Sequence, residues 1–289
     1  MHETPIRKFI ECEARPLAVI LGTNEIASAI AARLTYNGHR VILSQDPFTP
    51  VLRRKMAFHD ALFDEHVEVD GILGRGALSL VEIAETFARA EDVVAVTPLQ
   101  LTDLMVMRRL DALVDARLRA RSMTPDLRGF AFATLGVGPR FETGRDCDCA
   151  LKIQASHVDA LLDDEAVTPN HVTRPLGVAS PEPFIRAQRD GVWLTPLDIG
   201  ARVYKGIALG RHAGLRVFAP SDGVLLGIAR DGAYASKGAR LVEIDLRGRT
   251  PVLTGSDEHG RTIANAAMRA IRSLASRRQS LAASDHALY

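Results

Sequence analysis

The sequence predicts an α/β protein in which a Rossmann-like, doubly wound sheet over residues 16–170 precedes a small all-β domain over residues 182–250. Three observations carry this prediction. Apolar runs of strand length alternate with segments of helical spacing, a strand–turn–helix–strand unit opens the chain, and the second half contains a repeat displaced by 32 residues. A C-terminal helix over 260–275 and a flexible tail over 276–289 complete the predicted organisation.

The opening unit begins with Leu17–Leu21, a continuous apolar run that is typical of a strand buried on both faces of a parallel sheet. Gly22 ends this strand, and one of the two polar residues that follow can cap a helix with apolar positions at helical spacing. Gly38 suits the left-handed position after that helix, and Arg40–Ser44 restores the strand pattern. The turn after such a strand can receive an anion at the helix N-terminus.

This turn departs from the dinucleotide-binding pattern G-x-G-x-x-G. Gly22 keeps the first glycine and Ala27 is accepted at the third, but Asn24 stands at the second and Glu25 adds negative charge. Asp46 follows the second strand, where an acid can hold a ribose hydroxyl, although aspartate is also an ordinary turn residue. Two interpretations therefore remain: a nucleotide site at Gly22, Asn24 and Asp46, or a structural unit without a tightly held nucleotide.

Further elements continue the alternation. Val93–Val96 and Ala131–Leu135 are apolar strands, and Leu78–Ala90 and Leu101–Leu110 are predicted helices. The basic cluster Arg53–Lys55 on another predicted helix can contact a phosphate or can form a solvated helix face.

Two charged residues lie near the end of a predicted strand over 112–117. Asp115 and Arg117 point to the same side if this segment is a strand. They can form part of a ligand site, because ligands bind at the carboxyl ends of strands in open α/β sheets, or an internal ion pair that closes the strand end.

A second candidate anion cradle follows the strand at Ala131–Leu135. Gly136, Gly138 and Gly144 lie within nine residues, and Asp146 comes directly after them. Since this loop, the Gly22 turn and Asp115 all follow strands, we expect them to meet in one crevice, with Asp115, Arg117 and Asp146 as its functional side chains.

The cysteines give no disulfide framework, because Cys12, Cys147 and Cys149 are few and closely placed. Cys147 and Cys149, two positions apart on a predicted strand, are expected on one face with His157 nearby, where they can accept sulfur or selenium or remain ordinary strand cysteines. No metal site is predicted, because structural zinc needs four suitably spaced ligands.

Composition narrows the class of protein. The chain has 289 residues, 47% of them hydrophobic, and 36 basic against 35 acidic residues give a net charge of +1. This balance offers no general reason to bind nucleic acid or a membrane. The N-terminus has no signal-peptide core and no stretch reaches the length of a membrane span, so a cytoplasmic protein is expected, as is a homo-oligomer.

A set of short motifs resembles the accessory proteins of selenium-dependent molybdenum hydroxylase systems, the maturation factors of enzymes of the xanthine dehydrogenase kind. The motifs are Gly22–Ala27 with Arg33–Leu34, Arg53–Lys55 with Phe58, Leu110–Arg117, and Leu135–Pro139 with Phe141, Gly144 and Asp146. The resemblance covers about residues 16–272 and implies an accessory role for a molybdenum-containing hydroxylase client, with a nucleotide or molybdopterin-type ligand in the glycine-rich crevice. The alternatives are an NAD(P)-dependent oxidoreductase and a non-catalytic scaffold.

The second half repeats itself after a boundary expected near 170–182. Asp190-Gly191-Val192, Gly200, Lys205 and Gly206 recur 32 positions later as Asp222-Gly223-Val224, Gly232, Lys237 and Gly238. Short strands with glycine turns at this spacing predict two similar halves of a β-sandwich, which resembles the biotinyl and lipoyl carrier fold, a barrel-sandwich hybrid. Lys205 and Lys237 lack the neighbouring methionine of the carrier signature, so they are interpreted as turn lysines.

Overall fold

The computed structural model of the protein describes residues 15–63, 65–118, 124–153, 158–161, 184–246 and 251–286. It divides into two compact units. The first comprises residues 1–47, 54–163 and 254–289, and the second comprises residues 48–53 and 164–253. The expected boundary near 170–182 lies outside the described residues.

The first unit contains strands and helices in alternation, with two short 3₁₀ helices, η1 and η2, after the second strand. Its elements are β1 (Leu17–Leu21), α2 (Glu25–Tyr36), β2 (Arg40–Ser44), η1 (Arg54–Met56), η2 (Phe58–Phe63), β3 (Val67–Val69), β4 (Ile72–Gly76), α3 (Leu80–Arg89), β5 (Val93–Thr97), α4 (Leu101–Leu104), β6 (Leu110–Asp115), β7 (Ala131–Val137), β8 (Cys149–Ile153), β9 (Val158–Leu161) and α5 (Glu258–His286).

These strands form one nine-stranded sheet in the order β3-β4-β5-β2-β1-β6-β7-β8-β9. All neighbouring pairs from β4 to β8 are parallel, and the two outer pairs, β3 with β4 and β8 with β9, are antiparallel. β1 lies at the centre, between β2 and β6, and its five residues are all buried. A continuous apolar run is what such a position requires, because both faces of the strand are covered.

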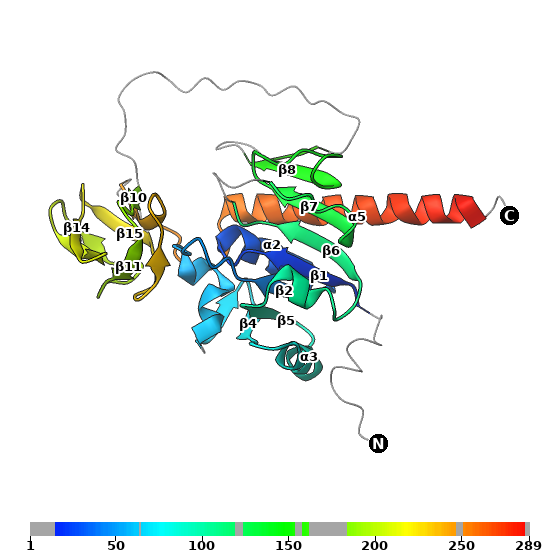
Figure 1. Cartoon of the computed structure of the whole chain (residues 1–289), viewed down its shortest axis with the longest axis horizontal. Helices are drawn as coiled ribbons and strands as arrows, with labels where there is room; N and C mark the ends of the chain where they lie inside the picture. Colours follow the sequence, from blue (N-terminus) through cyan, green and yellow to red (C-terminus); the bar gives the residue numbers. More distant parts are fainter. Residues whose placement is uncertain are drawn as a thin grey trace. The chain divides into compact units, whose positions relative to one another are not determined.

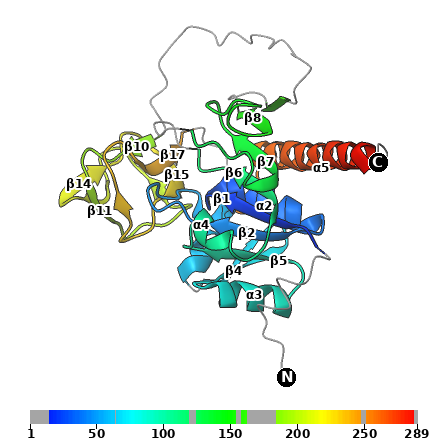
Figure 2. The ribbon, with the colours of Figure 1, turned by 45° about the vertical axis from the view of Figure 1, so that its right-hand side comes forward.

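Each face of the sheet has its own core. One core joins the sheet to α2 and α5, and the other joins it to α3 and α4. α5 packs against α2 and against β7, β8 and β9, and Figure 1 shows this helix, in orange to red, running past β7. Figure 2 shows α3 beside β4 and β5 and the short α4 near β2. The helix that covers one side of β7 therefore comes from the far end of the chain.

The prediction of a Rossmann-like doubly wound sheet is wrong. In a doubly wound sheet, crossover helices between successive parallel strands cover both faces. Here the described residues between β6 and β7 and between β7 and β8 contain no helix, and α5 covers that region instead. The two antiparallel edge pairs make the sheet mixed.

Three local predictions also change. The helix expected through Leu110 stops at Leu104, because Leu110 already begins β6. The helix expected around the basic cluster is replaced by η1 and η2. The expected tail over 276–289 is helical to His286, as a continuation of α5.

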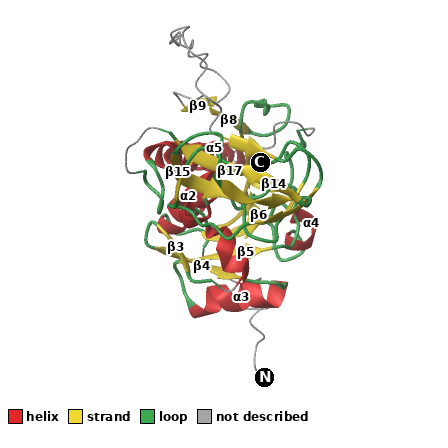
Figure 3. Cartoon of the chain, turned by 90° about the vertical axis from the view of Figure 1, so that its left-hand side faces the viewer, coloured by secondary structure: helices red, strands yellow, loops and turns green. Residues whose placement is uncertain are grey.

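The described residues of the second unit form β-strands and loops, and Figure 3 shows its strands β14, β15 and β17. Its strands are β10 (Phe184–Arg186), β11 (Gly191–Leu194), β12 (Arg202–Val203), β13 (Ala208–His212), β14 (Leu215–Phe218), β15 (Gly223–Ile228), β16 (Tyr234–Ala235) and β17 (Arg240–Asp245). They form two four-stranded sheets, β10-β17-β15-β12 and β14-β13-β11-β16, around one core with the buried Trp193.

The 32-residue repeat is visible in the strands, and each sheet combines strands from both halves of the repeat. β11, β12 and β13 become β15, β16 and β17 when 32 is added to their first residues, and each sheet takes two strands from each half. The Lys237 amide donates to Asp190 Oδ1 at 2.7 Å, and the Lys205 amide donates to Asp222 Oδ1 at the same distance. The aspartate of each half therefore accepts a hydrogen bond from the lysine turn of the other half.

The expected class of this unit is corrected as well. We find two four-stranded antiparallel sheets in a unit that also includes the upstream residues 48–53, and not a biotinyl/lipoyl-like barrel-sandwich limited to 182–250. The Leu52 carbonyl accepts a hydrogen bond from the Ile228 amide, and Arg53 makes two hydrogen bonds to Glu243, at 2.9 and 2.7 Å. Glu243 is buried, so its charge depends on this arginine.

The first prediction concerns that ion pair. Arg53→Ala leaves a buried carboxylate without its main partner, and we expect the free energy of unfolding to fall by about 3 kcal/mol or more. Arg89→Ala is the matched control, because its pair with Glu85 is exposed and should contribute below about 1 kcal/mol. Urea denaturation of both variants measures the difference, and equal losses would contradict the role given to Arg53.

Candidate functional site

The carboxyl ends of β1, β2 and β6 meet where the chain leaves β1. The Gly22 amide donates to the Ser44 carbonyl at the end of β2, at 2.8 Å. Gly22 has φ of 108°, and a Cβ there would lie 3.1 Å from the Ala116 carbonyl oxygen beyond β6. Glycine is therefore required both by the backbone angle and by the close approach of the two chain segments.

Asn24 closes this turn with its side chain. Its Oδ1 accepts hydrogen bonds from the amides of Ile26 and Ala27, both at 3.0 Å, so it caps α2. Its Nδ2 donates to the Ala116 carbonyl at 2.7 Å. In a dinucleotide-binding turn the helix N-terminus faces the pyrophosphate. Here the amides of Ile26 and Ala27 are already satisfied, so the cradle expected at Gly22 is occupied by the protein itself.

Asp115 and Arg117 form a pair in which one edge of the guanidinium is fixed. Arg117 Nε donates to Asp115 Oδ1 at 3.0 Å, Nη2 donates to Oδ2, and the Arg117 amide also donates to Oδ1. Both side chains are largely buried. Burial opposes the charge on Arg117, but Asp115 and the nearby charge of Asp46 raise its pKa above the ordinary value. Asn24, Asp46, Asp115 and Arg117 thus gather at one place, which we call the carboxyl-end cluster.

His59 contacts the turn after β1, a role that the sequence does not reveal. Its Nδ1 lies 2.9 Å from Thr23 Oγ1, and both residues are buried. Neither the spacing nor the surrounding residues of His59 indicate this contact, because η2 brings it back from beyond β2. The basic cluster Arg53–Lys55 precedes His59, and two of its arginines are held in ion pairs within the protein. Arg54 pairs with Asp60 at 2.7 Å, and Arg53 pairs with Glu243. These two side chains therefore form neither the expected phosphate site nor the expected solvated face.

The glycine-rich loop after β7 is held by its own hydrogen bonds. The Gly138 amide donates to the Leu151 carbonyl and the Gly144 amide to the Cys147 carbonyl. A Cβ on Gly136 would lie 2.1 Å from the Phe141 ring. Gly136 therefore makes room for an aromatic side chain, and the amides of Gly138 and Gly144 serve the loop rather than an anion.

Asp146 does not join the carboxyl-end cluster. Asp115 is level with Gly136 in the sheet, whereas Asp148 is hydrogen-bonded to Thr134. The Asp146 carbonyl accepts from the Leu127 amide, which precedes the first residue of β7. Asp146 thus lies several residues toward the amino end, and its side chain is paired with Arg145, which lowers its pKa. The single crevice expected from the sequence is not formed.

The two cysteines lie in opposite cores. Cys147 belongs to the core under α3 and α4, and Cys149, the first residue of β8, belongs to the core under α2 and α5. The expectation that both share one face is wrong because Cys147 precedes the strand. Burial raises the pKa of the Cys147 thiol to about 12, with smaller contributions from Cys149 and nearby aspartates. His157 lies outside the described residues.

The described residues contain no group of three or more histidine, cysteine, aspartate or glutamate side chains suited to a metal ion. None of the helices in the same part of the chain combines the length and the apolar character that a membrane span needs.

Comparisons with known proteins give a distant relative and weak structural neighbours. No family model matches the chain. It is 28% identical over 268 residues to the uncharacterized protein YqeB of Escherichia coli (strain K12), covering 89% of this chain and 48% of that protein. The chain thus spans about half the length of the curated relative it matches.

Among solved structures, the ectoine utilization protein EutE (DoeB) from Ruegeria pomeroyi is 14% identical, with a TM-score of 0.23 and coverage of 80% of this chain and 85% of that chain. A succinylglutamate desuccinylase/aspartoacylase from Rhodobacter sphaeroides has the same identity and coverages and a TM-score of 0.24. Neither neighbour is named as a molybdenum hydroxylase accessory protein, and the expected grouping with those proteins stays a prediction from the sequence motifs. At such TM-scores the neighbours assign no activity to the chain.

The second prediction tests the Asn24 cap. Asn24→Ala removes two hydrogen bonds to the start of α2 and one to Ala116, so we expect unfolding to become easier by about 1–2 kcal/mol. Ser79→Ala at the start of α3 removes one exposed cap bond, from the Glu82 amide, and one exposed bond to the Glu82 carboxylate, and should cost less, about 0.5–1 kcal/mol. Thermal denaturation measures the stability of both variants, and a larger loss of stability for Ser79→Ala than for Asn24→Ala would contradict the role given to Asn24.

The third prediction concerns the thiols. Because the pKa of Cys147 is raised to about 12, its reactive thiolate is scarce at pH 8, and its burial limits access. We expect iodoacetamide at pH 8 to leave Cys147 and Cys149 unmodified in the folded protein and to modify both in urea, as measured by peptide mass spectrometry. Rapid labelling of either residue in the folded protein would restore the thiol-acceptor hypothesis.

Proposed function

We propose that the carboxyl-end cluster binds a small anionic cofactor or precursor that also carries a hydroxyl group, and that the chain serves another enzyme as an accessory protein. The observation that carries the proposal is the state of Arg117. Asp115 fixes the Nε–Nη2 edge of its guanidinium, while Nη1 makes no hydrogen bond within the described part of the chain. An oriented, partly buried guanidinium with a remaining donor edge is suited to a carboxylate or phosphate.

The charges around Arg117 restrict the ligand. Asp115 and Asp46 together carry two negative charges against the one positive charge of Arg117. An anion without other polar groups would therefore be repelled by the negative charge of Asp46. A ligand with a hydroxyl beside its anionic group offsets part of this repulsion, because a carboxylate accepts a hydrogen bond from a hydroxyl. The cluster therefore favours hydroxylated anions over inorganic phosphate.

The backbone next to the cluster supports a functional interpretation. Leu118, directly after Arg117, has φ of 56°. A bulky non-glycine residue in the left-handed region carries strain, and such strain is concentrated at binding and active sites.

A dinucleotide-dependent oxidoreductase is the weaker alternative. Its ligand would need the amides at the start of α2, and Asn24 holds those of Ile26 and Ala27. The molybdenum-containing hydroxylase as client stays a prediction from the sequence motifs, as do a homo-oligomeric state and a cytoplasmic location.

The fourth prediction uses two Asp-x-Arg pairs of the same geometry. Asp126 and Arg128 make the same set of side-chain and backbone hydrogen bonds as Asp115 and Arg117, but they are exposed. We expect Arg117→Met to weaken ribose 5-phosphate binding by about tenfold or more, since a charge-assisted hydrogen bond contributes about 1.5–3 kcal/mol. Arg128→Met is the matched control and should bind as the wild type does.

Isothermal titration calorimetry measures these affinities. Asp46→Asn should weaken ribose 5-phosphate binding and leave inorganic phosphate binding unchanged or stronger, because only the first ligand offers a hydroxyl. If Arg117→Met and Arg128→Met bind ribose 5-phosphate equally well, the assignment of the ligand to Arg117 is wrong.

A further inference from the structure

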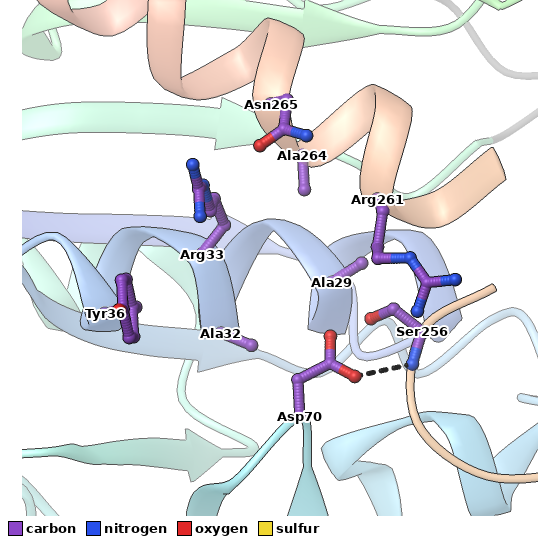
Figure 4. Close-up of a pocket in the computed structure, with 9 residues that line it drawn as sticks. All are labelled: Ala29, Ala32, Arg33, Tyr36, Asp70, Ser256, Arg261, Ala264 and Asn265. Atoms are coloured by element: carbon purple, nitrogen blue, oxygen red, sulfur yellow. Dashed lines mark hydrogen bonds between the residues drawn. The ribbon is translucent and has the colours of Figure 1, made fainter. Parts of the chain in front are cut away.

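One pocket of the first unit shares no residue with the carboxyl-end cluster. It lies where α2, the start of α5 and the turn between β3 and β4 come together, and it has a volume of about 260 Å³ (Figure 4). Ligand pockets usually begin near about 300 Å³, so the space suits a small molecule. Its lining residues are Ala29, Ala32, Arg33, Tyr36, Asp70, Ser256, Arg261, Ala264 and Asn265.

Ser256 is the most informative of these residues. It is only 5% exposed, it lines the pocket, and its Oγ has no hydrogen-bond partner among the described residues. A buried hydroxyl without a partner is unfavourable, so an unsatisfied one beside a pocket indicates a missing ligand. Figure 4 shows this oxygen on the pocket side, while the Ser256 amide donates to Asp70 Oδ1 at 2.9 Å.

The backbone holds Ser256 in this position. Gly255 has φ of 67°, and a Cβ there would lie 3.1 Å from Asp70 Oδ1. Asp70 itself has φ of 51°, which aspartate tolerates better than most residues. Two left-handed residues thus bring the turn and the start of α5 together around the serine.

Two arginines give the pocket its charge. Arg33 comes from α2 and Arg261 from α5, and neither forms an ion pair within the described part of the chain. Against their two positive charges stands Asp70, whose Oδ1 is already engaged by the Ser256 amide. The Asn265 amide adds a neutral donor, and Figure 4 shows it beside Arg33. No other charged residue lines the pocket.

From this arrangement we infer that the pocket between α2 and α5 binds a small organic dianion, with Arg33 and Arg261 pairing with its anionic oxygens and Ser256 Oγ donating a hydrogen bond to it. A phosphate monoester and a dicarboxylate both present this chemistry. The site is independent of the function proposed for the carboxyl-end cluster.

The test is calorimetric titration of the full chain with glycerol 3-phosphate and with succinate. We expect one of them to bind one molecule per chain, and the identity of the binder distinguishes the two sources of dianion. The double variant Arg33→Gln/Arg261→Gln should weaken that binding at least tenfold. Arg269→Gln, an exposed arginine on α5 outside the pocket, is the matched control and should leave the affinity unchanged.

Ser256→Ala separates a ligand role from a structural one. Because the hydroxyl lacks a partner in the protein, the ligand-free melting temperature should stay the same or rise, whereas the melting shift produced by the dianion should shrink. Arg117→Met should not alter this binding, so failure of the two sites can be told apart. Absence of binding for both dianions, or an undiminished affinity in the double variant, would overturn the inference.

Discussion

The side chain of Asn24 determines how the open end of the central sheet is built. Through one amide group it caps α2 and ties the turn after β1 to the chain beyond β6. Gly22 permits this because its backbone approaches Ala116 so closely. The strand ends are thereby fixed relative to one another, and Asp115 and Arg117 emerge at a defined place beside Asp46. The same interaction removes the open helix N-terminus on which nucleotide binding depends.

The predictions from the sequence succeeded where burial alone determines structure. Leu17–Leu21, Arg40–Ser44 and Val93–Val96 are strands because each contains at least three consecutive apolar residues, which a parallel sheet covers on both faces. They failed where distant segments determine the outcome. A single sequence does not reveal that α5 covers the region of β7 and β8, and so the sheet was expected to be doubly wound.

The candidate site was predicted in part for the same reason. Asn24, Asp115 and Arg117 lie at or just beyond the ends of strands that are neighbours in the sheet, as the reasoning from strand ends expected. Asp46 was expected only as a ribose-binding acid, and it lies near Arg117 because β2 is the other neighbour of β1. Asp146 also follows a strand in sequence, but its loop folds back along β7, and the hydrogen bond to Leu127 fixes it toward the other end. In that loop Gly136 makes room for the Phe141 ring. The sequence alone does not distinguish a glycine needed for such packing from a glycine that forms an anion cradle.

The reciprocal aspartate contacts of the second unit show how its two halves are related. Asp190 serves the turn at Lys237, and Asp222 serves the turn at Lys205. A half of this unit on its own would expose an acceptor and a donor that have no internal counterpart, yet two copies of one half would satisfy both. The two halves are thus related in the way that the subunits of a closed two-fold dimer are: each contributes to the other the same contact that it receives, here within a single chain.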